Sequence, residues 1–299
     1  MVMARRTDSC TKMPAGFAAR RLKWNVRLQG ALLVCFFATL TPLSAQDSAR
    51  ERILLPVWSN ETVPGAFGSL WKIDLAIVNQ NNEAVQIDSY DYGCVLAACP
   101  PTPPTPPKIT FSPLLKSVRT EVQGFFLYVA KDQAADVHFE LRVRDLTRQA
   151  QTWGTEIPVV REQDYRTSRF DLVDIPVTNG FRELLRVYDL DPSLGKAQVR
   201  VQLFGTLHRL TPFTSSLQPA PQDMLLLDAA RDFAYTTSGG GVLTYPGYVE
   251  LGDLGQYAQG GTFDSVRVEI QPLTAGHRYW AMVSVTNNDS QHVTMITPH

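Results

Sequence analysis

The chain has 299 residues, 44% of them hydrophobic and 19% charged, and a formal net charge of −1. This apolar content is typical of a globular protein and excludes a largely disordered chain. Residues 1–45 hold seven of the 28 basic residues and one of the 29 acidic residues, so the remaining chain carries a net charge of −7. An acidic surface attracts a polyanion poorly, so we expect no nucleic-acid partner.

The first 45 residues are organised like a secretory signal peptide. Four basic residues between positions 20 and 27 precede a short apolar run at 31–40, and small residues follow up to Ala45. The apolar run is too short to span a bilayer, which takes roughly 20 residues. We therefore expect cleavage near Ala45 and an exported, periplasmic or extracellular protein with no stable transmembrane segment.

The rest of the chain alternates apolar and polar residues with period 2, between turns rich in Gly, Pro, Asn and Asp. In its first part we expect strands at 53–58, 69–79, 84–90, 108–111, 124–130, 137–146 and 152–160. Pro56 places the first of these at a sheet edge, because proline cannot donate to a central ladder. We expect 69–79 and 84–90 to pair as a hairpin.

A Cys- and Pro-rich insertion at 91–108 contains Cys94 and Cys99. These two cysteines are the ones that remain after the leader is removed, and an oxidising compartment favours a disulfide between them. So small a ring contributes only about 2 kcal/mol, enough to fix a local turn. Free or intermolecular thiols and metal or redox chemistry are alternatives, although the spacing is not Cys-x-x-Cys and zinc needs about four ligands.

The stretch "PPTPPTPP" at 100–107 favours polyproline II and a stiff crossing between strands, with a ligand for a proline-binding module as the alternative.

A polar segment at 161–170 is predicted to be a linker, after which the pattern restarts. Residues 171–177, 181–191 and 196–205 are similar in pattern to the first three strands, a weak repeat of roughly 120 residues that indicates two domains of one type, 46–160 and 171–299. The later strands are expected at 223–229, 239–251, 263–273, 278–288 and 292–297. The stretch 221–235 is the best helix candidate and fits a strand followed by a turn equally well.

Short antiparallel strands at regular spacing favour sheets packed face to face, because a parallel sheet would need crossover helices. The sequence therefore predicts an all-β fold: two tandem immunoglobulin-like antiparallel β-sandwiches after a signal peptide.

Three stretches carry a resemblance to a known group: "LPVWSN" at 55–60, "GAFGSLWKIDLAIVNQNNEAVQI" at 65–87 and "YWAMVSVTNNDSQHVTMITP" at 279–298. They resemble uncharacterised exported bacterial proteins built from immunoglobulin-like β-sandwiches. The matching positions are Leu55 to Val57, Gly68, Trp71 to Leu75, and Asn79. The resemblance implies export and a sandwich fold, and it supplies no catalytic residue.

Motifs for catalysis or cofactor binding are not found in the sequence. The five histidines are dispersed, and there is no Gly-x-Ser-x-Gly elbow or phosphate-binding loop, so we expect no cofactor and no metal. Asp189 and Asp191 alternate as in a calcium loop and form a weak calcium candidate. Gly195, one position late, and the lack of a closing Glu favour an ordinary turn.

Four tryptophans, Trp58, Trp71, Trp153 and Trp280, lie within predicted strands, where a large aromatic side chain usually fills the core. The alternative is a platform that stacks on sugars, and Trp58 and Trp153 are the weak ligand-binding candidates. We expect a non-catalytic exported protein, an adhesion, scaffolding or envelope interaction module with an unknown protein or glycan ligand. A carbohydrate-binding module is the alternative, and an extracytoplasmic hydrolase that uses loop carboxylates is a third, less favoured one.

Overall fold

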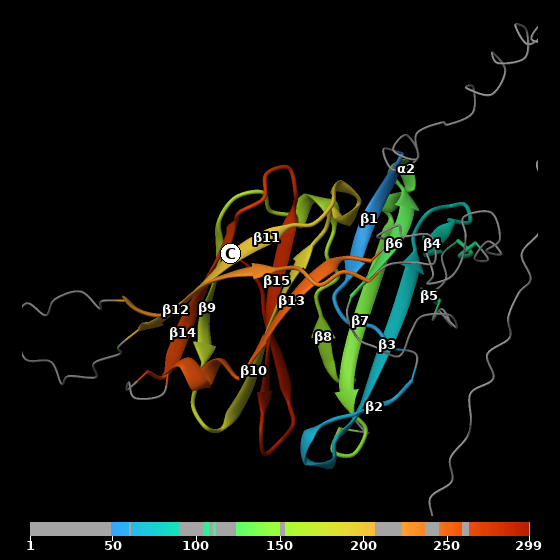
Figure 1. Cartoon of the computed structure of the whole chain (residues 1–299). Helices are drawn as coiled ribbons and strands as arrows, with labels where there is room; N and C mark the ends of the chain where they lie inside the picture. Colours follow the sequence, from blue (N-terminus) through green and yellow to red (C-terminus); the bar gives the residue numbers. More distant parts are fainter. Residues whose placement is uncertain are drawn as a thin grey trace, which may run out of the picture. The chain divides into compact units, whose positions relative to one another are not determined.

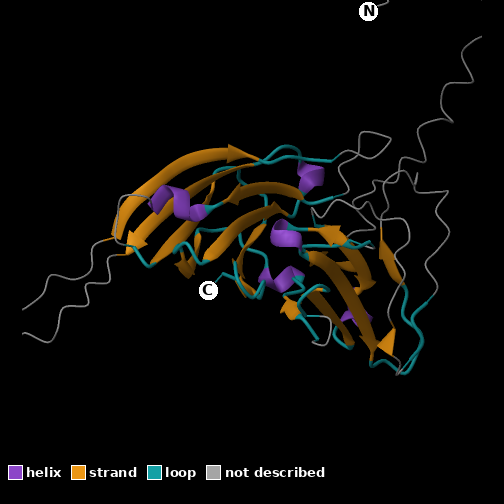
Figure 2. Cartoon of the chain, turned by 90° about the horizontal axis from the view of Figure 1, so that it is seen from below, coloured by secondary structure: helices purple, strands orange, loops and turns teal. Residues whose placement is uncertain are grey.

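A computed structural model describes residues 49–59, 61–89, 104–107, 110–111, 124–149, 153–206, 223–236, 245–258 and 263–298. These residues belong to one compact unit that spans 46–299. They form an all-β fold of four antiparallel sheets with a few short helices (Figures 1 and 2). The predicted signal peptide, Cys94 and Cys99 lie outside the described residues. Across the described ranges, no helix has the length and apolar character needed to cross a membrane.

The N-terminal half, residues 49–157, contains two sheets. Sheet I has the strand order β1-β6-β4, and sheet II has the order β2-β3-β7-β8, with β5 also paired to β3. Their bounds are β1 Arg50–Leu55, β2 Val63–Pro64, β3 Leu70–Asn79, β4 Ile87–Ser89, β5 Thr110–Phe111, β6 Phe125–Ala130, β7 Val137–Asp145 and β8 Thr155–Ile157. The 3-10 helix η1 (Ala66–Gly68) joins β2 to β3, and α2 (Lys131–Ala134) joins β6 to β7.

The C-terminal half, residues 170–298, contains the other two sheets. Sheet III has the order β13-β10-β15-β16 and sheet IV the order β12-β11-β14-β9. Their bounds are β9 Phe170–Pro176, β10 Phe181–Asp189, β11 Gln198–Thr206, β12 Asp223–Asp232, β13 Gly247–Gly252, β14 Ser265–Pro272, β15 Tyr279–Asn287 and β16 Val293–Ile296. The 3-10 helices of this half are η3 (Pro192–Leu194) and η4 (Leu254–Ala258), and η2 (Glu162–Asp164) lies in the segment between the halves.

Every strand predicted from the alternation overlaps an observed strand. In β3, residues Ile73, Leu75 and Ile77 are buried while their neighbours are partly exposed, as a strand with one face on the core requires. The prediction that 53–58 is an edge strand is confirmed for β1, which lies at the edge of sheet I, although β1 ends at Leu55, one residue before Pro56. The helix candidate at 221–235 is strand β12, which pairs with β11 along its length.

The predicted hairpin between 69–79 and 84–90 is wrong, because β3 belongs to sheet II and β4 to sheet I. The chain changes sheets at Asn79, whose side chain is fully buried. Its amide nitrogen donates to the carbonyl oxygens of Glu83 and Thr105 at 2.9 and 3.0 Å, and its Oδ1 accepts the Asn81 backbone N–H at 2.9 Å. The bond to Asn81 forms an Asx turn, and the bond to Thr105 ties this turn to a distant segment of the chain, so the chain leaves sheet II here.

The two halves have corresponding strand orders. The order β1-β6-β4 of sheet I matches β9-β14-β11 of sheet IV, and the order β3-β7-β8 of sheet II matches β10-β15-β16 of sheet III. The strands that the sequence pairs by similarity, 53–58 with 171–177 and 69–79 with 181–191, occupy corresponding places. The internal repeat is therefore present in the topology.

Sheet III is buried on both faces. In β15, Tyr279, Ala281 and Val283 belong to the core shared with sheet IV, whereas Trp280 and Met282 belong to the core of the N-terminal half. Alternate residues of a strand point to opposite faces, so both faces of β15 are covered. Tyr188 of β10 also enters the N-terminal core, where its hydroxyl donates to the Pro56 carbonyl at 2.6 Å.

The predicted linker 161–170 packs against both halves. Arg161 pairs with Glu51 of β1 at 2.8 Å, and the buried Tyr165 donates its hydroxyl to the Arg52 carbonyl at 2.6 Å. Arg166 exchanges two backbone hydrogen bonds with Tyr279 at the start of β15, at 2.8 and 2.7 Å. The segment thus contributes to the packing between the halves, and the division into two domains stays a prediction.

Candidate functional site

Asp191, one of the two calcium candidates, binds two arginines where the halves meet. Its Oδ1 accepts hydrogen bonds from Arg52 of β1 and from Arg278, both at 2.7 Å. Its Oδ2 accepts the backbone N–H and Nε–H of Arg278, both at 2.9 Å. Burial alone would raise the pKa of Asp191, but the hydrogen bonds from the two guanidinium groups outweigh it and lower the pKa. The carboxylate is therefore charged and fully engaged.

Asp189, the other calcium candidate, is fully buried at the end of β10. Its Oδ2 accepts the hydroxyl proton of Tyr235 at 2.7 Å, and its Oδ1 lies 2.9 Å from Nδ1 of His277. The same Oδ1 accepts the Asp191 backbone N–H at 3.1 Å. The fold brings Asp189 and Asp191 together but gives each carboxylate oxygen a protein donor, so the pair lacks free oxygens for Ca²⁺.

The contact between His277 and Asp189 has the geometry of two members of a catalytic triad. However, the His277 side chain is buried and its ring stacks on Tyr279 with a centroid separation of 6.3 Å. None of its hydrogen bonds in the described part of the chain involves a serine or cysteine. A substrate could not reach this pair in the observed packing, so it stabilises the connections around β10 and β15.

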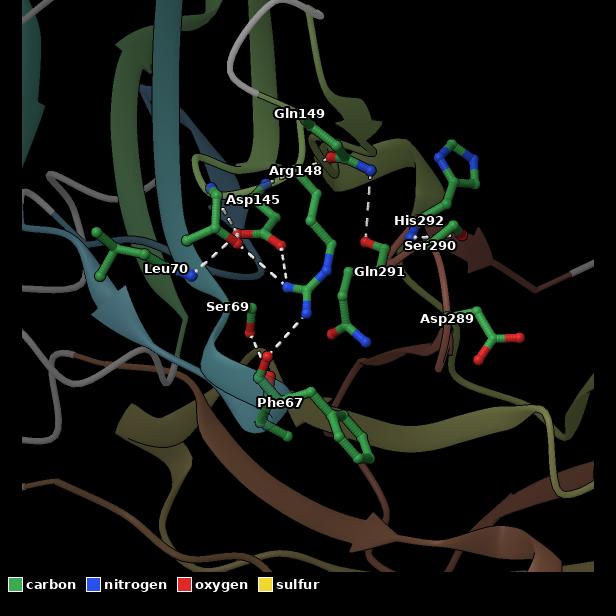
Figure 3. A network of polar contacts seen from close by, with 12 residues as sticks. Phe67, Ser69, Leu70, Asp145, Arg148, Gln149, Asp289, Ser290, Gln291 and His292 are labelled. Carbon is green, nitrogen blue, oxygen red and sulfur yellow. Dashed lines mark hydrogen bonds and ion pairs between the residues drawn. The ribbon is translucent and has the colours of Figure 1, made fainter.

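A second polar network joins the turn after β7 to the turn between β15 and β16 (Figure 3). At its centre is the fully buried carboxylate of Asp145, which accepts the Leu70 backbone N–H at 2.9 Å and the hydroxyl proton of Thr147 at 2.7 Å. Arg148 pairs with the same carboxylate at 3.0 Å. Burial would raise the pKa of Asp145, but these hydrogen bonds outweigh it and hold the pKa at about 2.

Arg148 also fixes an exposed aromatic residue. Its Nη2 donates to the carbonyl oxygen of Phe67 at 2.8 Å (Figure 3). Phe67 has a φ of 54°, in the left-handed region that non-glycine residues seldom adopt. Its ring is 63% exposed, and the Arg182 guanidinium lies 4.9 Å from the ring centroid. A strained, exposed aromatic residue held by two arginines marks a candidate interaction residue.

Arg182 links this residue to the C-terminal half. It donates to Oδ1 of Asn288 at 3.0 Å and to Oε1 of Gln291 at 2.8 Å, both in the turn between β15 and β16. Burial, and then the nearby charge of Arg148, lower the pKa of Arg182. Its hydrogen-bond partners among the described residues are neutral amides, so its positive charge adds to that of Arg148 beside the ring of Phe67.

Trp153 lies at the same end of sheet II. Val143 of β7 pairs with Thr155 of β8, so Trp153, two residues before Thr155, lies beside Asp145 at the end of β7. Asp145 in turn pairs with Trp71, near the start of β3. The side chain of Trp153 is 86% exposed. Gly154 follows with a φ of +75°, and a side chain there would collide with the Val143 carbonyl. The glycine thus lets the backbone approach β7 closely and fixes where Trp153 emerges.

Trp58, the other ligand-binding candidate, is only 5% exposed and belongs to the N-terminal core. It follows β1, and Trp153 precedes β8, so neither lies within a strand. The structure therefore separates the two candidates: Trp58 packs inside, and Trp153 is available to a ligand.

Sequence reasoning did not select Phe67, Asp145, Arg148 or Arg182. A signal for Phe67 is present, because an aromatic residue between Gly65 and Gly68 is unusual for a turn. The roles of the other three depend on turns that meet only in the fold.

Within the described ranges, no group of three or more His, Cys, Asp or Glu side chains is arranged to hold a metal ion. Comparisons of the chain with protein-family models, with curated proteins and with solved structures found no match.

Proposed function

We propose that the chain is a non-catalytic exported interaction module of two tandem immunoglobulin-like β-sandwiches, an adhesion, scaffolding or envelope-associated protein. It presents the Phe67 and Trp153 end of sheet II to a protein or glycan ligand in the envelope or extracellular space. The proposal extends the resemblance to exported bacterial sandwich proteins.

Support for the immunoglobulin-like assignment comes from the pairing order. In immunoglobulin domains, strands B, E and D are neighbours in one sheet, and C, F and G are neighbours in the other. The strands β9, β14 and β11 with β10, β15 and β16 follow this order, and β1, β6 and β4 with β3, β7 and β8 repeat it. Strand A has no counterpart among the described residues of either half.

The observation that carries the functional proposal is the exposure of Phe67 and Trp153 next to one turn, 145–149. Buried aromatic residues are the rule in this fold, since Trp58, Trp280, Tyr188 and Tyr279 are all in the core. Leaving two large aromatic side chains in water, Phe67 between two arginines and Trp153 near the end of β7, has no benefit for folding, whereas such residues dominate binding energy at interfaces.

The test measures binding of the purified mature protein to bacterial envelope vesicles and peptidoglycan sacculi. We expect Trp153→Ala and Phe67→Ala each to weaken binding about tenfold or more, as central interface residues do. Met224→Ala is the matched control, because Met224 is 56% exposed on β12 of the other half. Binding equal to wild type for both aromatic variants would overturn the proposal.

Export is tested separately by the intact mass of the protein recovered from the periplasm or medium. A new N-terminus near Gln46 is expected, and an uncleaved chain recovered in the cytoplasm contradicts export.

A carbohydrate-binding module is the second candidate, favoured by the 86% exposure of Trp153. Its signature is binding to a glycan array that Trp153→Ala abolishes. Trp58→Ala is not informative for this purpose, because removing a core tryptophan disrupts folding.

A further inference from the structure

Glu183 of β10 carries a buried carboxylate with no cationic partner among the residues that the structure describes. The residue is 3% exposed, and its Oε1 has no hydrogen-bond partner in the described structure. Its Oε2 accepts one long hydrogen bond, from the Gly255 backbone N–H at 3.4 Å. Among the described residues, no lysine or arginine forms an ion pair with it. A buried charge in this state is costly unless something compensates for it.

Two more oxygen atoms face the same small space beside Gly255. The position that a Cβ atom on Gly255 would take is 3.3 Å from the Val177 carbonyl oxygen, 3.7 Å from Oδ1 of Asp253 and 3.8 Å from Oε2 of Glu183. These three oxygens come from the segment after β9, from the turn before η4 and from β10. Glycine at position 255 keeps the space between them open.

The backbone holds this arrangement in place. Asp253 donates its backbone N–H to the Glu183 carbonyl at 2.8 Å and accepts that of Gln256 at 3.1 Å. Asp253 has a φ of 51°, a left-handed conformation that turns the chain sharply before η4. Its side chain is exposed, so the space is closed by Glu183 on the inside and open to solvent at Asp253.

We propose that Glu183, Asp253 and the Val177 carbonyl form a binding site for a hard divalent cation, with Ca²⁺ as the fitting ion. Ca²⁺ binds six to eight oxygen ligands, commonly a mixture of carboxylates, backbone carbonyls and water. The two carboxylates neutralise the ion, the carbonyl completes the protein ligands, and water reaches the remaining positions from the exposed side. This proposal rests on the fold alone and does not depend on the proposed interaction surface.

Without a cation, Glu183 can be a buried neutral acid. Burial, and then the nearby charge of Asp253, raise the pKa of Glu183, so the carboxyl group retains a proton more readily when no cation is bound. A protonated Glu183 would donate a hydrogen bond to a nearby oxygen, whereas a bound cation would replace that proton. The two readings differ in their response to added Ca²⁺.

The experiment measures the thermal midpoint of the purified mature protein at pH 7.5, first in EDTA and then in CaCl₂ up to about 10 mM, a range that covers weak extracellular calcium sites. We expect the midpoint to rise by about 3 °C or more, and calorimetry to show one ion per chain. Equal concentrations of MgCl₂ should give a smaller shift, because Mg²⁺ demands a tighter octahedral geometry.

Two variants test the ligands. Glu183→Gln and Asp253→Asn preserve side-chain shape and are expected to lose both the shift and the calorimetric signal. Asp174→Asn is the matched control: Asp174 also has a left-handed φ, 57°, and the substitution removes one charge from outside the site. If Glu183→Gln does not fold, Asp253→Asn decides alone, because Asp253 is exposed. The proposed site is wrong if Ca²⁺ does not raise the thermal midpoint of the wild type. It is also wrong if both ligand variants retain the rise.

Discussion

The two ends of β10 place acidic side chains in opposite electrostatic surroundings. Near its C-terminal end, Asp189 and Asp191 accept hydrogen bonds from a tyrosine, backbone amides and two arginines, with His277 in contact. Near its start, Glu183 accepts one long backbone hydrogen bond, and the charge of the Asp253 carboxylate contributes to raising its pKa. Both ends are buried in sheet III, so burial alone does not decide the role of a carboxylate.

The difference lies in what each carboxylate joins. Asp191 binds arginines from β1 and from the start of β15, and thereby connects the two halves. Glu183 faces elements of the C-terminal half only, around Gly255. A carboxylate that pairs with arginines of the protein stabilises the packing of the chain. A carboxylate that faces other oxygen atoms is arranged to bind a cation from solution.

The largest effect is expected for Asp191→Ala. The substitution removes the carboxylate that the guanidinium groups of Arg52 and Arg278 share, and breaking a buried ion pair on one side costs about 3–5 kcal/mol. Urea unfolding measures the loss. Asp228→Ala, which breaks the exposed pair with Arg200, is the control and should change little. A loss under about 1 kcal/mol for Asp191→Ala would show that its pairs behave like surface ones.

Asp145→Ala extends the comparison to a third buried carboxylate and should cost about 2–3 kcal/mol, because the Leu70 and Thr147 donors lose their acceptor. The pKa of Asp145 is lowered to about 2 from 3.8, so its stabilisation is present above pH 4 and lost as the pH falls toward 2. Acid unfolding followed by fluorescence should be less steep in the variant. If stability falls equally steeply below pH 4 in the variant and in the wild type, the Asp145 carboxylate does not provide this stabilisation.

Tyr235→Phe tests the donor side of Asp189. The hydroxyl donates to Asp189 and accepts the Ala197 backbone N–H at 2.7 Å, so its loss should cost about 1–2 kcal/mol. The aromatic ring and its packing on Phe233 are retained, which makes the change specific for the hydroxyl. Denaturant unfolding gives the magnitude, and wild-type stability would mean that water replaces the hydroxyl.

Glu183→Gln should have the smallest effect and the opposite sign, a gain of about 1 kcal/mol in EDTA at pH 8, because the variant no longer buries a charge. The pKa of Glu183 is raised above its ordinary value of 4.5, so in the wild type its contribution is present at low pH and is lost as the pH rises through the folded-state pKa. Stability measured from pH 4 to 8 should therefore decline more in wild type than in the variant. A loss of stability at pH 8 would contradict the electrostatic contrast between the two ends of β10.

Much of the fold follows from local patterning. The alternation in β3 predicts the buried residues Ile73, Leu75 and Ile77, because a strand with one covered face needs apolar residues at every second position. In β7 the same pattern predicts the buried Leu141, while Phe139 and Val143 on that face are partly buried. The hairpin between β3 and β4 could not be rejected in this way, since a tight turn and a crossing both use polar residues. The side-chain hydrogen bonds of Asn79 select the crossing, and their acceptors at Glu83 and Thr105 are separated from it by very different chain lengths.

The candidate sites were less accessible to sequence reasoning. The spacing of Asp189 and Asp191 attracts attention, but their partners Arg52 and Arg278 lie far away in the chain. Glu183 could have been noticed in the sequence, because it lies on the same face of β10 as the buried Leu185 and Val187. An acidic residue in phase with the core indicates either a buried ion pair or a ligand site, and the choice requires knowing what lies opposite.

The sequence by itself determined the class of the fold, the positions of the strands and the repeat, because period-2 burial and turn chemistry act over a few neighbouring residues. The tertiary structure alone decided that sheet III is covered on both faces, that Trp58 is buried while Trp153 is exposed, and that carboxylates of similar burial have different partners. These outcomes depend on contacts between residues more than a hundred positions apart, such as Tyr188 with Pro56 and Asp191 with Arg52. Local patterns carry no information about such pairings, since many distant partners satisfy the same alternation.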